Sequence, residues 1–141
     1  MPKRCIEVSI PGSTSNFGSG FDTLGMAVNL YQGVKLERLE ADDGENIEIL
    51  PANGPCASAK LVELIEEASD LYWKISGQRR FAFRVGLSGD LPVGKGLGAS
   101  GALRAGLISG LSHLAGNAAP LQEVLNARPI WSTTRTMCRP R

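Results

Sequence analysis

The sequence predicts a single domain that contains both strands and helices. Its 141 residues are close to the usual size of one domain. Stretches in which every second residue is apolar alternate with stretches of helical spacing, so both element types are expected. Glycine is in excess, with 17 residues, and eight of them fall between residues 86 and 110. We therefore expect the backbone to bend tightly there, or to approach a ligand closely.

Four stretches predict strands. In the first, Ile6, Val8 and Ile10 alternate with polar residues, and Pro11 and Gly12 are expected to end it. The same reasoning predicts a strand that leads directly into the glycine cluster, and a turn at residues 42–44 between two of the others. The four predicted strands cover residues 5–10, 34–39, 47–50 and 81–87.

Two longer helices and one short helix are predicted. Apolar residues follow helical spacing over 61–75, Gly77 stands where a C-terminal cap is expected, and Tyr72 and Trp73 are expected in the core. A second apolar stripe over 103–114 is closed by Gly116. Pro120 suits the first turn of a short third helix.

The composition favours a soluble globular protein and argues against several partners. The net charge is +1, but four arginines follow Ala127; without them 11 Lys and Arg face 14 Asp and Glu, a charge of −3. A basic surface for nucleic acid or an anionic membrane is therefore not expected. The three cysteines lack disulfide or zinc spacing, and no apolar run is long enough to span a bilayer. We expect a cytoplasmic protein.

The glycine cluster contains a loop that suits a phosphate group. Residues 91–102 lie between a predicted strand and a predicted helix, where backbone amides and the helix dipole favour an anion. A glycine-rich turn that binds nothing is the alternative. A Walker A loop is excluded because Gly96 stands where a Mg²⁺-binding hydroxyl is needed. A dinucleotide fingerprint is excluded because the preceding strand ends too far upstream and Glu123 falls in a predicted helix.

Taken as a whole, this segment resembles the phosphate loop of the GHMP kinases, Pro-x-x-x-Gly-Leu-Gly-Ser-Ser-Ala. Ala99 and Gly101 depart from that pattern, and Pro92, Gly96, Leu97, Gly98 and Ser100 match it. The resemblance implies that Ser100 helps to hold Mg²⁺, and that ATP is bound along the whole loop. The implied ATP-binding residues are Pro92, Val93, Gly94, Lys95, Gly96, Leu97, Gly98, Ala99, Ser100, Gly101 and Ala102.

A second glycine-rich segment, residues 11–25, reads as a long loop and resembles the N-terminal signature of homoserine kinases. On their own, Asn16 and Asp22 would be ordinary turn residues. By the resemblance they contribute to the amino-acid substrate site, Asp22 as an acceptor for an ammonium group. The fixed signature positions filled here are Pro11, Ser13, Thr14, Asn16, Gly18, Gly20, Phe21, Asp22, Leu24 and Gly25.

The resemblance covers roughly residues 5–126 and implies a fold and a reaction. The fold is α+β, a GHMP kinase N-terminal domain with a mixed sheet, helices and the phosphate loop at a helix N-terminus. The reaction is transfer of the γ-phosphoryl group of ATP to the hydroxyl of L-homoserine, in threonine biosynthesis, with no carboxylate base assigned. Another alcohol substrate, or an inactive nucleotide-binding remnant, are the alternatives. A homodimer is compatible with the resemblance.

The last residues differ in character from the rest. Residues 128–141 carry four arginines, no acid and no clear periodicity. With suitable synonymous codons around the single codons of Trp131 and Met137, the neighbouring reading frame gives Leu-Glu-His-His-Pro-Asp-Asn-Val-Pro-Ala-Ala. This resembles the homoserine kinase segment Leu-Glu-Gly-His-Pro-Asp-Asn-Val-Ala-Pro-Ala, whose glutamate is a Mg²⁺ ligand. We therefore expect a kinase domain over 1–127 and an unstructured frameshift product over 128–141, which leaves the kinase C-terminally truncated.

Overall fold

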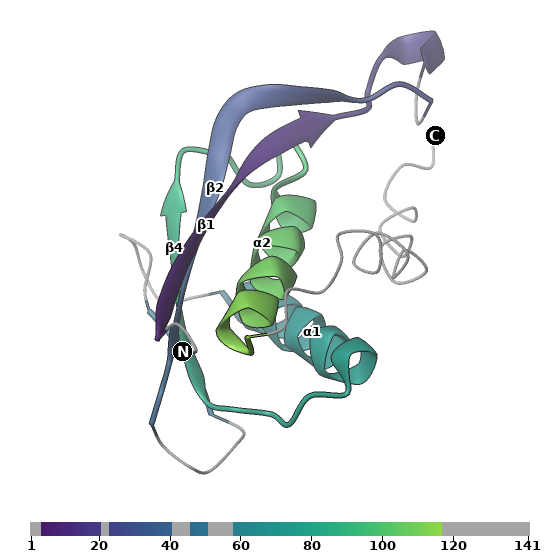
Figure 1. Cartoon of the computed structure of the whole chain (residues 1–141). Coiled ribbons are helices and arrows are strands. Elements are labelled where there is room, and N and C mark those ends of the chain that lie inside the picture. Colours follow the sequence, from purple (N-terminus) through teal and green to yellow (C-terminus); the bar gives the residue numbers. More distant parts are fainter. Residues whose placement is uncertain (1–3, 21–22, 41–45, 51–57, 117–141) are drawn as a thin grey trace.

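The chain folds into a four-stranded sheet with two helices on one of its faces (Figure 1). The computed structural model describes residues 4–20, 23–40, 46–50 and 58–116. In chain order the elements are β1 (Cys5–Thr14), the short 3-10 helix η1 (Gly18–Gly20), β2 (Met26–Arg38), β3 (Ile47–Ile49), α1 (Ala59–Ser76), β4 (Phe83–Gly89) and α2 (Ala99–Leu114). The predicted turn at 42–44 and the helix expected from Pro120 lie outside the described residues.

The sheet is mixed, as the family resemblance implies. Its strand order is β1-β2-β4-β3. β2 is antiparallel to both β1 and β4, whereas β3 runs parallel to β4. A parallel neighbour needs a crossover connection, and here α1 lies in the chain between β3 and β4. The α+β fold predicted from the sequence is therefore confirmed.

The prediction that Pro11 and Gly12 end the first strand is wrong. β1 continues to Thr14, because it is an edge strand and proline is tolerated where a backbone N–H is not needed by a second neighbour. The pairing shifts at this point: Pro11 faces Tyr31, but Ser13 faces Ala27, so β2 contains two extra residues. This bulge bends the long hairpin over the end of the sheet, as Figure 1 shows.

β2 is also much longer than the strand predicted over 34–39. Its first half, from Met26, escaped prediction because the bulge interrupts the alternation on which the prediction depends. The two shorter strands are closer to their predictions. β3, Ile47–Ile49, lies within the predicted range 47–50, and β4, Phe83–Gly89, overlaps the predicted range 81–87 with a shift of two residues.

Both long helices are confirmed, and Gly77 caps α1 as expected. α1 begins after Ser58, whose side chain accepts a hydrogen bond from the Leu61 amide, and it ends at Gly77 in the left-handed conformation with φ 62°. α2 begins at Ala99, four residues before the predicted apolar stripe, and is followed by Gly116 at φ 75°. Neither helix in the described part of the chain is long and apolar enough to cross a membrane.

The core lies between the two helices and the sheet. Val34, Leu36 and Val85 from the sheet are completely buried, and so are Ile65 of α1 and Leu107 of α2. An aromatic chain extends this core, with ring centroids 4.8 Å, 4.9 Å and 6.4 Å apart along the sequence Tyr72, Trp73, Phe81 and Phe83. Tyr72 and Trp73 are therefore core residues, as predicted.

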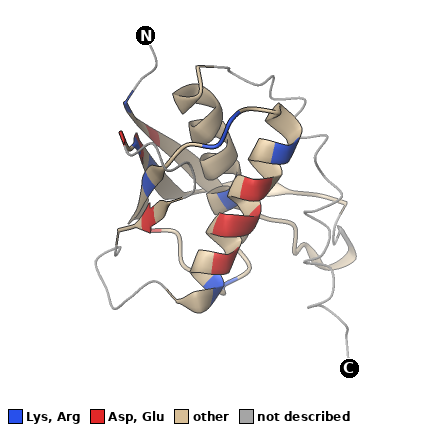
Figure 2. Cartoon of the chain, turned by 90° about the horizontal axis from the view of Figure 1, so that it is seen from below, with Lys and Arg blue, Asp and Glu red and all other residues tan. Residues whose placement is uncertain are grey.

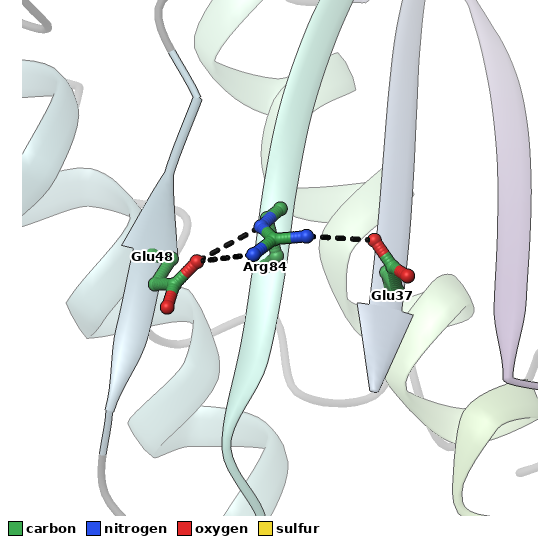
Figure 3. Close-up of polar contacts among 3 residues, drawn as sticks. All are labelled: Glu37, Glu48 and Arg84. Atoms are coloured by element: carbon green, nitrogen blue, oxygen red, sulfur yellow. Dashed lines mark hydrogen bonds and ion pairs between the residues drawn. The ribbon is translucent and has the colours of Figure 1, made fainter. Parts of the chain in front are cut away.

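The opposite face of the sheet is polar. Arg84, flanked in β4 by the buried Phe83 and Val85, points away from the helices and bonds Glu48 of β3 at 2.8 Å and Glu37 of β2 at 3.1 Å (Figure 3). The two carboxylates raise the pKa of the Arg84 guanidinium, Glu48 having the larger effect. This arrangement suits a face that stays in contact with water.

The outward side of α1 carries a row of acidic residues, with a lysine near each end (Figure 2). The acids are Glu63, Glu66, Glu67 and Asp70, and all are exposed. Two of them form surface ion pairs, Glu67 with Arg104 at 3.0 Å and Asp70 with Arg80 at 3.1 Å. The helix therefore has one apolar face against the core and one solvated face.

Candidate functional site

The glycine loop connects β4 to α2 and depends on backbone conformations that favour glycine. Gly94, Gly96 and Gly98 have φ values of 76°, 73° and 70°, in the left-handed region that side-chain-bearing residues rarely adopt. Val93 is 81% exposed and Lys95 is exposed, so this part of the loop projects into solvent. The repeated left-handed turns explain why the sequence concentrates glycine here.

The loop ends at the N-terminus of α2, which no side chain caps. Gly98 precedes the helix and has no capping group, whereas α1 is capped by the hydroxyl of Ser58. The first hydrogen bond within α2 runs from the Ala102 amide to the Gly98 carbonyl, 2.9 Å long. The amides of the first turn, including that of Ser100, therefore have no acceptor within the helix. Open amides and the positive end of the dipole together suit an anion.

The start of the loop is fixed to β2 through Tyr31. The carboxylate of Asp90 accepts a hydrogen bond from the Tyr31 amide at 3.1 Å. In return, the amides of Asp90 and Leu91 donate to the Tyr31 carbonyl at 3.2 Å and 3.3 Å. Sequence reasoning missed this anchor, because an aspartate 59 residues from Tyr31 gives no local signal of the pairing.

The end of the loop lies against the last residues of β1. The Ser13 amide donates a hydrogen bond to the Leu97 carbonyl, 2.9 Å long. Gly12 is buried beside it, and a β-carbon at that position would lie 3.0 Å from the Leu97 oxygen and 3.1 Å from Val28 of the bulge. The two glycine-rich segments singled out in the sequence therefore meet in space, although about 80 residues separate them.

Asn16 follows this contact closely. It is exposed, it lies two residues after the end of β1, and its amide donates to the Thr14 hydroxyl at 3.3 Å. Three residues of chain extend over at most about 11 Å, so the Asn16 backbone stays within that distance of Ser13. Ser13 in turn contacts the end of the loop at Leu97. Asp22, the other predicted substrate residue, lies outside the described residues.

The comparison with protein families decides the identity of the fold. Residues 59–129, which include the glycine loop and both long helices, match the GHMP kinases N terminal domain. The chain belongs to the GHMP kinase family. The resemblance of its phosphate loop to the family pattern is thereby confirmed at the level of the family.

The chain is also similar to individual GHMP kinases. It is 31% identical over 121 residues to a homoserine kinase of Caldanaerobacter subterraneus, covering 86% of this chain and 38% of that protein. It is 35% identical over 123 residues to a homoserine kinase of Clostridium botulinum, covering 86% and 39%. The chain thus spans less than half the length of these relatives.

Solved GHMP kinase structures share the fold. A crystal structure of homoserine kinase from Cytophaga hutchinsonii superposes with a TM-score of 0.73 at 23% identity, covering 90% of this chain and 40% of that one. Methanococcus jannaschii mevalonate kinase gives 0.72 at 14% identity, covering 93% and 47%. Because two enzymes named for different substrates fit almost equally well, the fold alone does not select a substrate.

The described residues of this GHMP kinase domain do not form a complete metal site. They contain no group of three or more His, Cys, Asp or Glu side chains that would hold a metal ion. Ser100, exposed in the first turn of α2, offers one hydroxyl beside the open amides. Mg²⁺ usually takes few protein ligands and completes its shell with phosphate oxygens and water, so a single hydroxyl fits it when a nucleotide is bound as well.

Proposed function

We propose that this chain is the nucleotide-binding part of a homoserine kinase, which transfers the γ-phosphoryl group of ATP to the hydroxyl of L-homoserine and gives O-phospho-L-homoserine, in threonine biosynthesis. The observation that carries the proposal is the hydrogen bond between Ser13 and Leu97. It brings the segment with the homoserine kinase signature to the phosphate loop, and a kinase must hold both reactants together.

In this proposal the triphosphate is bound by residues 92–102. The left-handed glycines present successive amides, and the uncapped first turn of α2 adds its own amides and the helix dipole. Lys95 lies in the loop and is exposed, which leaves its ammonium group able to approach a phosphate oxygen. Most of the binding is assigned to the backbone, so the replacement of the family's first serine by Ala99 removes little.

The acceptor alcohol is assigned to the segment after β1. Asn16 and Asp22 would hold the amino-acid part of L-homoserine, the carboxylate of Asp22 accepting from the ammonium group. The names of the two relatives described above support this substrate. Phosphoryl transfer depends chiefly on positioning and charge neutralisation, so no carboxylate base is assigned.

Mg²⁺, when bound with ATP, neutralises the charge that the phosphate oxygens carry in phosphoryl transfer. Ser100 is the residue of this chain assigned to hold it. The hydroxyl stands in the first turn of α2, beside amides that would contact the same phosphates. In this assignment the Ser100 hydroxyl would be one ligand of the metal and would help to fix the position of the bound nucleotide.

Residues 128–141 are proposed to be read from a shifted frame. They lie outside the described residues, but the match to the GHMP kinases N terminal domain ends at residue 129, close to the point where the composition changes. Resequencing the locus tests this directly, because the proposal requires an alternate-frame continuation that encodes the Glu-His-His-Pro-Asp-Asn segment. An in-frame gene with no such continuation would refute it.

An inactive nucleotide-binding remnant is the second candidate. Two proteins separate the candidates: the chain as given and a frame-restored chain. Isothermal titration calorimetry with ATP, followed by an assay of ADP release with L-homoserine or mevalonate, is run on both. Turnover of homoserine only after frame restoration supports the kinase; turnover of mevalonate instead moves the assignment to another GHMP kinase.

The nucleotide site itself is tested by Ser100→Ala, with Ser9→Ala as the control because Ser9 is exposed on β1. Loss of the hydroxyl should weaken Mg·ATP binding while leaving the binding of metal-free ATP almost unchanged. Equal effects with and without Mg²⁺ would exclude Ser100 as the metal ligand.

The proposal also includes a cytoplasmic location and a homodimer. Cell fractionation tests the location, and analytical sedimentation tests the oligomeric state.

A further inference from the structure

We propose that Ser13 and Gly98 pack against each other and thereby hold the acceptor segment, the residues after β1 assigned to the acceptor alcohol, at a fixed position relative to the phosphate loop. We call this contact the joint. Through it, nucleotide binding at the loop would also restrain the end of β1. Both are positioning residues in this proposal, which rests on the proposed function. The contact between them joins the last residues of β1 to the residue that precedes α2.

Gly98 faces Ser13 and not open space. A β-carbon at Gly98 would lie 2.9 Å from the Ser13 hydroxyl oxygen, 3.1 Å from its carbonyl oxygen and 3.5 Å from its amide nitrogen. The next residue back, Leu97, accepts the hydrogen bond of the Ser13 amide at 2.9 Å. A side chain at Gly98 would therefore push β1 away from the loop and stretch that hydrogen bond.

The other left-handed glycines of the loop are different. At Gly94 and Gly96 a β-carbon would meet nothing within 4 Å, although their φ values of 76° and 73° are close to the 70° of Gly98. Substitution by alanine thus brings similar backbone strain at all three positions. Only at Gly98 does it also meet the neighbouring strand, which makes Gly96 a matched control.

The joint lies between the residues assigned to the nucleotide and the residues assigned to the acceptor alcohol. On one side Gly98 carries the carbonyl that starts α2 and stands beside the amides assigned to the triphosphate. On the other side Ser13 precedes Asn16 by three residues, and the amide of Asn16 is tied back to Thr14. A nucleotide that fixes the loop should therefore also fix the start of the acceptor segment, without touching it.

The test measures amide hydrogen exchange by NMR on the 141-residue chain, with and without ATP. In the parent protein, ATP should slow exchange of the Ser13 amide about fivefold or more, the lower end of typical coupling between sites. In Gly98→Ala the Ser13 amide should exchange faster even without ATP, and ATP should no longer slow it. In Gly96→Ala, compared without ATP, the Ser13 amide should exchange as in the parent, because a β-carbon there meets nothing within 4 Å.

The outcomes separate the joint from the proposed function. If the parent does not bind ATP, the nucleotide site fails, but the comparison of Gly98→Ala with Gly96→Ala without ATP still tests the joint. Equal Ser13 exchange in the two variants overturns the joint even when ATP binds normally. If Gly98→Ala does not fold but Gly96→Ala does, the contact with Ser13 is the difference between the two variants and the joint is supported. If neither folds, backbone strain alone accounts for the loss and the joint is overturned.

Discussion

Gly106 offers a sharp test of how α2 is seated on the sheet. A β-carbon at this position would lie 2.7 Å from Cγ2 of Val34, 3.2 Å from its Cβ and 3.5 Å from Cγ1 of Ile10. Val34 is completely buried and β-branched, so its side chain has little freedom to move aside. Gly106→Ala should therefore push α2 away from the sheet.

The magnitude follows from two opposing effects. Overpacking of a close-packed core costs about 1–3 kcal/mol. Replacing glycine by alanine inside a helix stabilises by about 1 kcal/mol. The free energy of unfolding should therefore fall by about 1 kcal/mol, within a range of roughly 0–2 kcal/mol.

Gly110, one turn later in α2, is the matched control. There a β-carbon would meet the terminal Cδ1 of Leu36, with its Cγ at 3.4 Å and Cγ2 of Val8 at 3.6 Å. The end of a leucine can rotate, so the helix propensity of alanine should offset more of the cost. Gly106→Ala should be less stable than Gly110→Ala by about 1 kcal/mol.

Urea unfolding followed by far-UV circular dichroism measures the difference as a shift in midpoint at constant slope. A Gly106→Ala chain as stable as Gly110→Ala, or more stable, would show that α2 can shift freely on the sheet. The seating of the helix would then not fix the position of Ser100 at its N-terminus, and the argument from close packing would fail.

Three further changes test other parts of the structure. Ser58→Ala removes the cap of α1 and should lower the free energy of unfolding by about 1 kcal/mol, measured by urea unfolding, with Ser58→Asp retaining the parent value. Arg84→Met leaves Glu37 and Glu48 without their shared cation and should lower stability slightly at low salt, and less at high salt; the same loss in 1 M NaCl would exclude an electrostatic cause. The Tyr72 hydroxyl is buried with no hydrogen-bond partner of standard geometry among the described residues, and burial raises its pKa above 10.0 despite the opposing effect of Ser76. Above about pH 10 the unfolded chain ionises first, so the parent should lose stability that Tyr72→Phe retains; identical pH profiles would contradict this.

Much of the fold follows from local patterns in the sequence. The spacing of apolar residues and Gly77 predict α1 almost to its ends, since a buried helical face and a left-handed cap are both local properties. The same logic fails at β1 and β2. A two-residue bulge and an edge position depend on which strand lies alongside, so local alternation does not reveal that β1 passes through Pro11 or that β2 begins at Met26.

In the candidate site, too, some features can be recognised from the sequence and others only from the tertiary structure. The glycine loop can be recognised from residue types alone, because left-handed turns before a helix favour glycine. Ser100 is singled out only by the family resemblance. Asn16, likewise, is singled out only by the resemblance to homoserine kinases. The sequence does not indicate that Asp90 anchors the loop to β2. Nor does it indicate that a β-carbon at Gly98 would meet Ser13 and not open space.

By itself the sequence determined the two long helices, part of each strand, the loop that suits an anion and the resemblance to GHMP kinases, because each of these is encoded in residues that are neighbours along the chain. The tertiary structure alone decided that the two glycine-rich segments touch, through Ser13 and Leu97. That contact joins an edge strand to a loop some 80 residues away, and it depends on the bend that the bulge in β2 gives to the hairpin. Such a bend arises from the pairing of whole strands, so no short stretch of sequence contains it.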